Sequence, residues 1–121
     1  MVGIRILAVN SEVVIRVSID YTRGEKMKFE WDYAKEQKNI QKHGLDFQSA
    51  ICVFQDNLRL EYYDEAHSLA EDRYVTIGLI NDAVLVVTVV YTERHDVIRI
   101  ISARKATRQE RSLYYDNLQG N

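Results

Sequence analysis

Arginines gather in the second half of the chain, at or near the ends of predicted β-strands. They are Arg73, Arg94, Arg99 and Arg104. A guanidinium group stays charged at any useful pH, and its planar fork of N–H donors matches the oxygens of a phosphate. Several such groups on one small sheet would bind a phosphodiester, and they could stabilise the extra negative charge that develops when it is cleaved.

Each arginine also has a structural explanation of equal weight. An arginine within a strand needs a partner for its charge, and acids such as Glu61, Asp64 and Glu71 are available. In the strand VIRIISAR, strict alternation places Arg99 and Arg104 on opposite faces, so both can line one pocket only if the strand is bulged. We favour Arg104, beside the following turn, as the functional residue and Arg99 as part of an ion pair.

Proton transfer has two candidates in the segment DEAHSLAEDRY. His67 can exchange a proton near neutral pH, and Glu71 follows it closely. The alternative for His67 is an exposed loop histidine beside solvated acids. Tyr114 and Tyr115, on the last predicted helix, offer a phenol or a stacking surface, although core packing is the stronger explanation for at least one of them.

Composition limits the class of protein. A chain of 121 residues, 46% of them hydrophobic, suits one domain. Its apolar runs are too short to span a membrane, and its start does not resemble a secretory signal, so we expect a cytoplasmic protein. A single cysteine, Cys52, excludes an internal disulfide, and its apolar neighbours predict a buried thiol. The three histidines lack the spacing of a zinc site, so no metal is expected.

Charge is distributed unevenly along the chain. The formal net charge is −2, but the segment from Arg94 to Arg111 contains six Lys or Arg residues and only two acids. A basic surface for one polyanion is therefore compatible with a neutral to acidic remainder. Lys38 and Lys42 add a further basic pair on one face of a predicted helix, where a solvated surface is the simpler explanation.

The first 26 residues contain two β-branched runs, IRILAV and VVIRVSIDY, joined by Asn10-Ser11. This pattern indicates a β-hairpin. A second methionine, Met27, follows the polar stretch TRGEK. Two interpretations remain: an additional hairpin, or an upstream extension of a shorter protein that begins at Met27.

Two helices are predicted after a short strand, KFEW. Asp32 is a typical N-cap for a helix from Tyr33 to about Lys42, and Gly44 is a typical C-terminal stop. The second helix begins at Asp46, and its apolar residues have the spacing of one buried face. They are Phe47, Ala50, Ile51 and Phe54.

Four strands follow as an antiparallel meander: LRLEYY, RYVTIGLI, AVLVVTVVYT and VIRIISAR. Asn81-Asp82 and the segment ERHD are the predicted turns between the last three. In AVLVVTVVY, apolar residues occupy both the odd and the even positions, so both faces of the strand are apolar. This pattern predicts an interior strand with helices on one of its faces. Thr107 and Glu110 form a capping box for a last helix that ends near Leu118.

The segment from Met27 to Tyr114 resembles the BrnT toxins of bacterial type II toxin–antitoxin systems. The matching pieces are FEWDYAKEQKNIQKHGLDFQSA, DEAHSLAEDRYVTIG and VVYTERHDVIRIISARKATRQERSLYY, in family-like order and spacing. The resemblance implies an α+β, RelE-like fold: a small antiparallel meander with two N-terminal helices and one C-terminal helix. Residues 27–121 would be the toxin domain, and residues 1–26 fall outside the match, which favours an extension.

The resemblance also implies an activity and its partners. It indicates a metal-independent ribonuclease without a cofactor, which arrests growth by cutting RNA. A cognate ribbon-helix-helix antitoxin, BrnA-like, would neutralise it, and DNA would be contacted only through the complex with that antitoxin. No membrane partner is expected.

We hypothesise that a ribose 2′-OH attacks its own phosphate. The expected proton acceptor is His67 or Glu71, and Tyr114 or Lys38 is the expected assisting group. The residues expected around the phosphate are Arg73, Arg94 and Arg104. The expected RNA contacts are Lys38, Lys42, Lys105 and Arg108. The alternative is a non-catalytic module that uses the same basic sheet face to hold RNA or a partner protein.

Overall fold

The two N-terminal runs form the predicted antiparallel hairpin. In this computed structural model, which describes residues 2–20, 24–80 and 84–119, β1 spans Val2–Val9 and β2 spans Glu12–Asp20. Both turn residues, Asn10 and Ser11, have positive φ angles of 49° and 68°. A two-residue turn of this kind matches the twist of the strands that it joins.

A strand and two short helices follow the hairpin, with the caps that the sequence predicts. β3 (Lys26–Asp32) leads into α1 (Tyr33–His43), where the Lys35 N–H donates to Asp32 Oδ1 at 2.9 Å. Gly44 ends α1 with a φ of 70°. Asp46 then caps α2 (Phe47–Ala50), which continues into the 3₁₀ helix η1 (Ile51–Gln55).

The second half of the chain is the predicted meander and its closing helix. Its elements are β4 (Leu60–Tyr63), the 3₁₀ helix η2 (Glu65–His67), β5 (Tyr74–Ile80), β6 (Leu85–Arg94), β7 (Val97–Lys105) and α3 (Arg108–Gln119). His95 and Asp96 form the turn between β6 and β7, with φ angles of 52° and 65°. The predicted Asn81-Asp82 turn lies outside the described residues.

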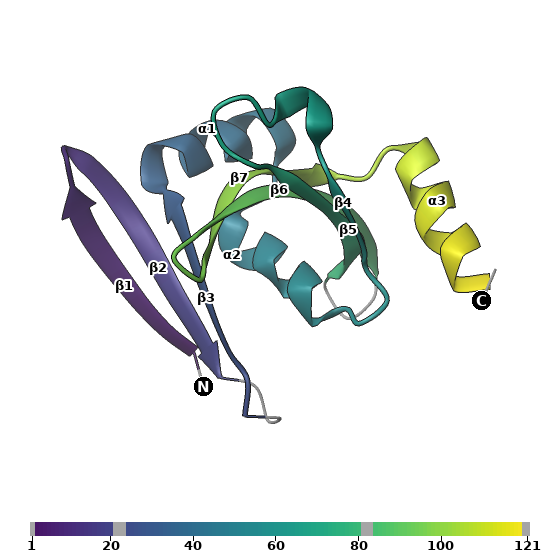
Figure 1. Ribbon diagram of the computed structural model, residues 1–121, viewed down its shortest axis with the longest axis horizontal. Helices are drawn as coiled ribbons and strands as arrows, with labels where there is room; N and C mark the ends of the chain where they lie inside the picture. Colours follow the sequence, from purple (N-terminus) through teal and green to yellow (C-terminus); the bar gives the residue numbers. More distant parts are fainter. Residues whose placement is uncertain (1, 21–23, 81–83, 120–121) are drawn as a thin grey trace.

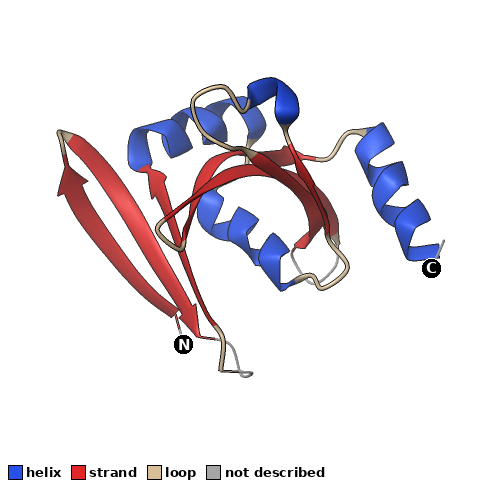
Figure 2. Cartoon of the chain, in the orientation of Figure 1, coloured by secondary structure: helices blue, strands red, loops and turns tan. Residues whose placement is uncertain are grey.

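All seven described strands belong to one sheet in the order β1-β2-β3-β7-β6-β5-β4. Figure 1 shows the hairpin at one end of this sheet and α3 near the other. β3 and β7 run parallel, with Phe29 opposite Ile98, and the other pairs are antiparallel. The α+β class is confirmed, but two details of the prediction are wrong: the sheet is mixed, and the first two helices follow three strands instead of standing at the N-terminus (Figure 2).

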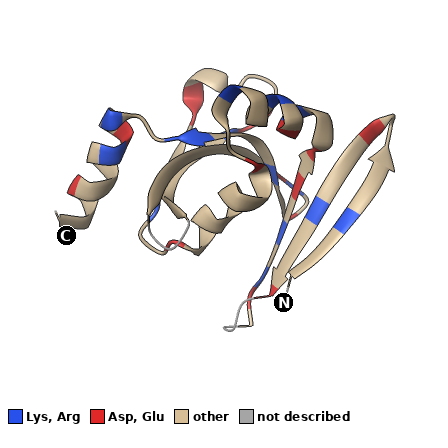
Figure 3. Cartoon of the chain, turned by 180° about the vertical axis from the view of Figure 1, so that it is seen from behind, with Lys and Arg blue, Asp and Glu red and all other residues tan. Residues whose placement is uncertain are grey.

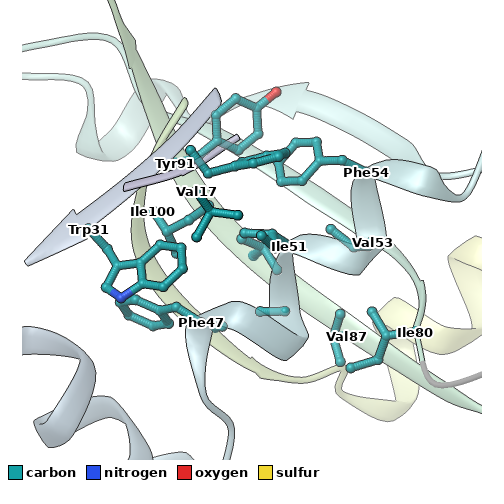
Figure 4. Packing of buried hydrophobic residues seen from close by; sticks show 14 of the residues in the cluster. Val17, Trp31, Phe47, Ile51, Val53, Phe54, Ile80, Val87, Tyr91 and Ile100 are labelled. Atoms are coloured by element: carbon teal, nitrogen blue, oxygen red, sulfur yellow. The ribbon is translucent and has the colours of Figure 1, made fainter. Parts of the chain in front are cut away.

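The main core lies between the sheet and the segment formed by α2 and η1. Figure 4 shows Trp31 and Ile100 from the strands packed around Phe47 and Ile51. All four side chains are buried. The apolar spacing of the second predicted helix is therefore confirmed, and we call the side of the sheet that it covers the inner face.

Cys52, in contrast, is exposed on η1, so the prediction of a buried thiol is wrong. It lies between the buried residues Ile51 and Val53, at the position of this turn that faces away from the sheet. Partial burial of the sulfur, followed by the nearby charge of Asp46, raises the pKa of the thiol.

One side chain of α1 completes the hydrogen bonding of β7. β3 pairs with β7 only as far as the contact between Glu30 and Arg99. Further along β7, Asn39 Oδ1 accepts from the Ala103 N–H at 3.2 Å, and Asn39 Nδ2 donates to the Ala103 carbonyl at 2.8 Å. An asparagine amide thus replaces the peptide group that a neighbouring strand would offer.

The opposite side of the sheet, which we call the outer face, is partly covered by α3. Tyr114 is buried there with Val75, Ile77 and Val86, whereas helices had been predicted on one face only. The Tyr114 hydroxyl donates to Asp56 Oδ2 at 2.5 Å. Burial, followed by this hydrogen bond, raises the pKa of the phenol.

None of the described helices is long and apolar enough to cross a membrane.

Candidate active site

A β-bulge in β7 determines which arginines share a face. Val90 is opposite Ser102 and Tyr91 is opposite Ile100, so Ile101 is the additional residue. One extra residue reverses the alternation of the side chains that follow it. Arg99 and Arg104 therefore both project from the outer face, opposite Thr92 and Thr88 of β6, and their predicted placement on opposite faces is wrong.

A pocket of about 410 Å³ opens on this outer face. Four meander strands and the loop between β4 and β5 contribute to its wall, and its polar lining consists of Tyr62, Asp64, His67, Arg73, Thr88, Ser102 and Arg104. Three of the predicted catalytic residues, His67, Arg73 and Arg104, therefore meet in one pocket.

His67 is joined to a carboxylate in this pocket. Its Nδ1 lies 3.0 Å and 3.1 Å from the two oxygens of Asp64. Asp64 is 18% exposed and His67 is 70% exposed, so the carboxylate is fixed while the ring projects toward solvent. A carboxylate on Nδ1 selects the tautomer in which the other ring nitrogen accepts a proton.

Ser68 closes the loop that carries these residues. The Asp64 N–H donates to the Arg73 carbonyl at 2.8 Å, and the Ser68 hydroxyl donates to the Asp64 carbonyl at 2.6 Å. The Arg73 N–H in turn donates to Ser68 Oγ at 2.9 Å. These contacts hold the first and last residues of the loop side by side, which keeps His67 near Arg73.

Arg73 and Arg104 differ in their partners. Within the described part of the chain, Arg73 makes no ion pair. Arg104 forms a bidentate pair with Glu110 at 2.6 Å and 3.0 Å. The Arg104 side chain is nevertheless 38% exposed at the pocket, so it presents a guanidinium that is fixed in position and paired with Glu110, while Arg73 has donors available for a ligand.

Glu110 connects the pocket to the start of α3. Its Oε1 accepts from the Thr107 N–H at 2.8 Å, and the Glu110 N–H donates to Thr107 Oγ1 at 3.1 Å, which confirms the predicted capping box. Burial acts to raise the pKa of Glu110, but the hydrogen bonds from Arg104 and Thr107 outweigh it and lower the pKa to about 2. The carboxylate therefore stays ionised and keeps Arg104 in place.

Three further polar residues of the pocket, Tyr62, Thr88 and Ser102, were not singled out in the sequence. Tyr62 lies on β4, and burial, followed by the charges of Glu110 and Asp64, raises the pKa of its phenol. Thr88 lies on β6 and is buried at this pocket. Alternation along each strand could have given the faces of these residues, but not the strand order that brings them together.

Glu71 and Arg94 are bound to each other instead of lining this pocket. Arg94 Nη2 and Nε donate to the two Glu71 oxygens at 2.7 Å and 3.0 Å. The hydrogen bond from Arg94 is the main cause that lowers the pKa of Glu71, which makes this carboxylate a weak base. Arg94 borders a neighbouring pocket of about 280 Å³ together with Arg99.

Arg99 is held by acids from the N-terminal strands. Its Nη1 donates to Glu30 Oε2 at 2.9 Å, and Glu12 lies at 3.7 Å. The side chain is only 14% exposed. The geometry is that of the expected structural ion pair, although the partner is none of the acids named from the sequence.

The remaining predicted residues lie away from the pocket. Tyr114 points from α3 into the packed outer face and its hydroxyl is bound to Asp56, so it does not reach the pocket. Lys38 and Lys42 are exposed on α1, whose basic positions are blue in Figure 3, and neither lines the pocket. Lys105 and Arg108 are exposed where β7 passes into α3, and neither lines the pocket.

The described residues contain no group of three or more His, Cys, Asp or Glu side chains that could hold a metal ion.

The arrangement can transfer a proton next to a bound phosphate. An imidazole fixed by a carboxylate stands beside two guanidinium groups, on the exposed side of a sheet that is rigidly packed on its other side. Fold and pocket together define a class of small α+β proteins with a basic polar pocket suited to phosphodiesters.

Comparison with known families gives a specific assignment. Residues 31–110 match the model of the family described as ribonuclease toxin, BrnT, of type II toxin–antitoxin system. The chain belongs to this family, as the resemblance predicted. The match begins at the end of β3 and therefore leaves β1 and β2 outside it. No curated protein matches the sequence.

Family membership implies an RNA target and an antitoxin partner.

Proposed function

We propose that this ribonuclease toxin is a metal-independent, RelE-like endoribonuclease whose active site is the pocket around His67. The observation that carries the proposal is the Asp64–His67 pair, 3.0 Å apart, in the same pocket as Arg73 and Arg104. A proton acceptor and two phosphate-binding cations are the groups that cleavage by a ribose 2′-OH requires.

The reaction assigned to this pocket begins at His67. Its Nε2 takes the proton of the 2′-OH while Asp64 holds the ring through Nδ1. The 2′-oxygen bonds to the adjacent phosphorus, and the bond from phosphorus to the 5′-oxygen breaks, which leaves a 2′,3′-cyclic phosphate. Tyr62, whose raised pKa keeps the phenol protonated, is placed to return a proton to the departing oxygen.

Arg73 and Arg104 stabilise the charge that this step creates. Arg73, which makes no ion pair among the described residues, binds a non-bridging phosphate oxygen. Arg104 is already fixed by Glu110, so it acts through a preorganised charge and loses no further side-chain freedom. Glu71 is not the base in this scheme, because its carboxylate is engaged by Arg94 and its pKa is lowered.

The partners follow from the family. We propose a ribbon-helix-helix antitoxin, BrnA-like, that neutralises the toxin and mediates any contact with DNA. The segment 27–121 is the proposed toxin domain. The hairpin nevertheless contributes Val14, Val17 and Ile19 to the buried residues, so it is packed as part of the sheet.

The test is incubation of purified protein with single-stranded RNA in EDTA. We expect the wild type to cleave RNA and His67→Ala to lose about 10²- to 10⁴-fold in rate. Arg73→Ala and Arg104→Lys should also lose activity. Lysine is chosen at position 104 because it keeps a positive charge beside Glu110, whereas alanine would leave that carboxylate unpaired. Lys35→Ala, on exposed α1, is the control.

Binding of RNA without cleavage by the wild type would favour the non-catalytic alternative. Full activity of the folded His67→Ala variant would show that the pocket is not the active site. Thermal melting and circular dichroism of each variant separate loss of chemistry from loss of folding.

A further inference from the structure

The outer face continues beyond the family-matched segment onto the N-terminal hairpin. Arg5 on β1 lies directly opposite Arg16 on β2, and Lys28 on β3 lies opposite Ser18. Strand alternation places all three cations on the outer face, and we call them the hairpin strip. Figure 3 shows the basic positions of β1 and β2 side by side.

The positive charge of this strip is only partly balanced. Arg16 donates to Glu30 at 3.1 Å, but Glu30 is shared with Arg99. Arg5 and Lys28 are exposed, and neither makes an ion pair within the described ranges. Like charges directly opposite each other on neighbouring strands are destabilising, so the pairing of Arg5 with Arg16 is unfavourable unless an anion lies between them.

A shallow site is present at this position. A pocket of about 370 Å³ has the three cations of the strip and Ser18 as its polar lining, and its other lining residues are Gly3, Ile4, Val17, Phe29 and Val97. Lys26, two residues before Lys28 on the same strand, is paired with Asp20 at 3.7 Å. The pocket offers guanidinium, ammonium and hydroxyl donors, which is the chemistry that recognises phosphate oxygens.

The strip and the His67 pocket lie on one continuous surface. Glu30 is the parallel neighbour of Arg99, and the bulge at Ile101 keeps Arg104 on the same side as Arg99. Neighbouring strands are about 4.8 Å apart, so β1 lies about 15 Å from β7, three spacings away, and about 24 Å from β5, which follows Arg73 of the pocket. A single RNA strand that fills the pocket can therefore extend across the sheet to the strip.

We propose that the hairpin strip is a second phosphate-binding site, which holds the RNA backbone beyond the scissile nucleotide. The inference rests on the proposed ribonuclease function and assigns part of the substrate contact to residues outside the matched family segment. The repeated phosphates of one RNA strand engage both sites at once, whereas an acidic peptide has no reason to reach the His67 pocket. The observations therefore favour RNA.

The experiment compares a dinucleotide with a long oligoribonucleotide. Arg5→Ala and Lys28→Ala should each weaken binding of the long RNA about three- to tenfold and lower the dependence of log affinity on log salt by about one. Affinity is measured in the His67→Ala background, where RNA stays intact. Dinucleotide cleavage, measured with His67 present, should not change. Lys35→Ala, which removes one exposed charge from α1, is the matched control.

The outcomes separate this inference from the proposed function. If the wild type cleaves neither substrate but both strip variants bind long RNA more weakly, the strip is supported and the catalytic proposal fails. Unchanged affinity for long RNA, or an equal loss in Lys35→Ala, would overturn the strip. So would variants that bind RNA normally but capture less co-expressed antitoxin, because the strip would then be a protein-binding site.

Discussion

Arg99 and Arg104 project from the same face of β7 although an odd number of positions separates them, because Ile101 is bulged out of the ladder. Each arginine meets a different carboxylate, Glu30 or Glu110. Because of the bulge, one face of β7 contains both Arg99, which is ion-paired near the hairpin, and Arg104, which lines the pocket near α3.

Glu110→Gln tests the link between the pocket and α3. Glutamine preserves the capping box but removes the charge that faces Arg104, so we expect a loss of about 1–2 kcal/mol in unfolding free energy at neutral pH. The pKa of Glu110 falls from its ordinary 4.5 to about 2 in the folded protein. Its contribution is therefore complete above pH 4.5 and is lost as the pH falls toward 2.

Urea unfolding at a series of pH values measures this effect. The stability curve of Glu110→Gln should be flatter than that of the wild type between pH 4.5 and 2. Asp116→Asn, an exposed position on the same helix, should leave the curve unchanged. Parallel curves for Glu110→Gln and the wild type would contradict the prediction.

Gly78→Ala should destabilise the fold through steric overlap. A Cβ at this position would lie 2.9 Å from Val53 Cγ2 and 3.0 Å from Asp56 Oδ2. Val53 is fully buried and Asp56 is held by the Tyr114 hydroxyl, so neither can easily withdraw. We expect a loss of about 1–3 kcal/mol, measured by chemical denaturation. Gly3→Ala is the control, because no atom lies within 4 Å of its added Cβ.

Tyr114→Phe distinguishes a core role from a catalytic one. The variant loses the hydrogen bond to Asp56, whose Oδ2 still accepts from the Leu79 N–H. We expect a loss of about 1–2 kcal/mol in stability and no change in RNA cleavage. Tyr115→Phe, at an exposed position, should change neither quantity. A large loss of cleavage in stably folded Tyr114→Phe would show that the Tyr114 phenol takes part in the reaction.

Asp64→Ala and Glu71→Gln compare the two carboxylates that flank His67 in the sequence. Removal of Asp64 frees the imidazole, so we expect cleavage to fall about tenfold or more. Glu71→Gln changes only a partly exposed pair with Arg94 and should leave the rate within about twofold of the wild type. Initial rates on one RNA substrate check both. The reverse order of effects would make Glu71 the base.

Local sequence signals predicted most of the elements. Asp32, Gly44 and the Thr107–Glu110 box mark helix ends through contacts within a few residues, and all three were confirmed. The turns at Asn10-Ser11 and His95-Asp96 depend on local backbone geometry in the same way. Such features can be predicted because their partners are close in sequence.

Long-range features could not be predicted in this way. The parallel pairing of β3 with β7, and the bulge at Ile101, arise from contacts between distant strands. The Asp64–His67 pair is local, because the two residues are three positions apart, but its place in one pocket with Arg104 depends on the order of the strands. Arg73 and Arg104 were predicted from residue type, but their different pairing follows from tertiary structure alone.

The parallel contact between β3 and β7 also has a consequence for how the chain folds. Hairpin β1–β2 with β3, and the meander β4 to β7, each form through neighbouring segments, whereas Phe29 and Ile98 meet from distant parts of the chain. Closing that long loop costs conformational entropy, and the contacts that offset this cost form only after the loop has closed. The toxin therefore consists of two locally encoded halves that join where β3 meets β7 and in the core that they share, and the docking of these halves is the expected slow step of folding.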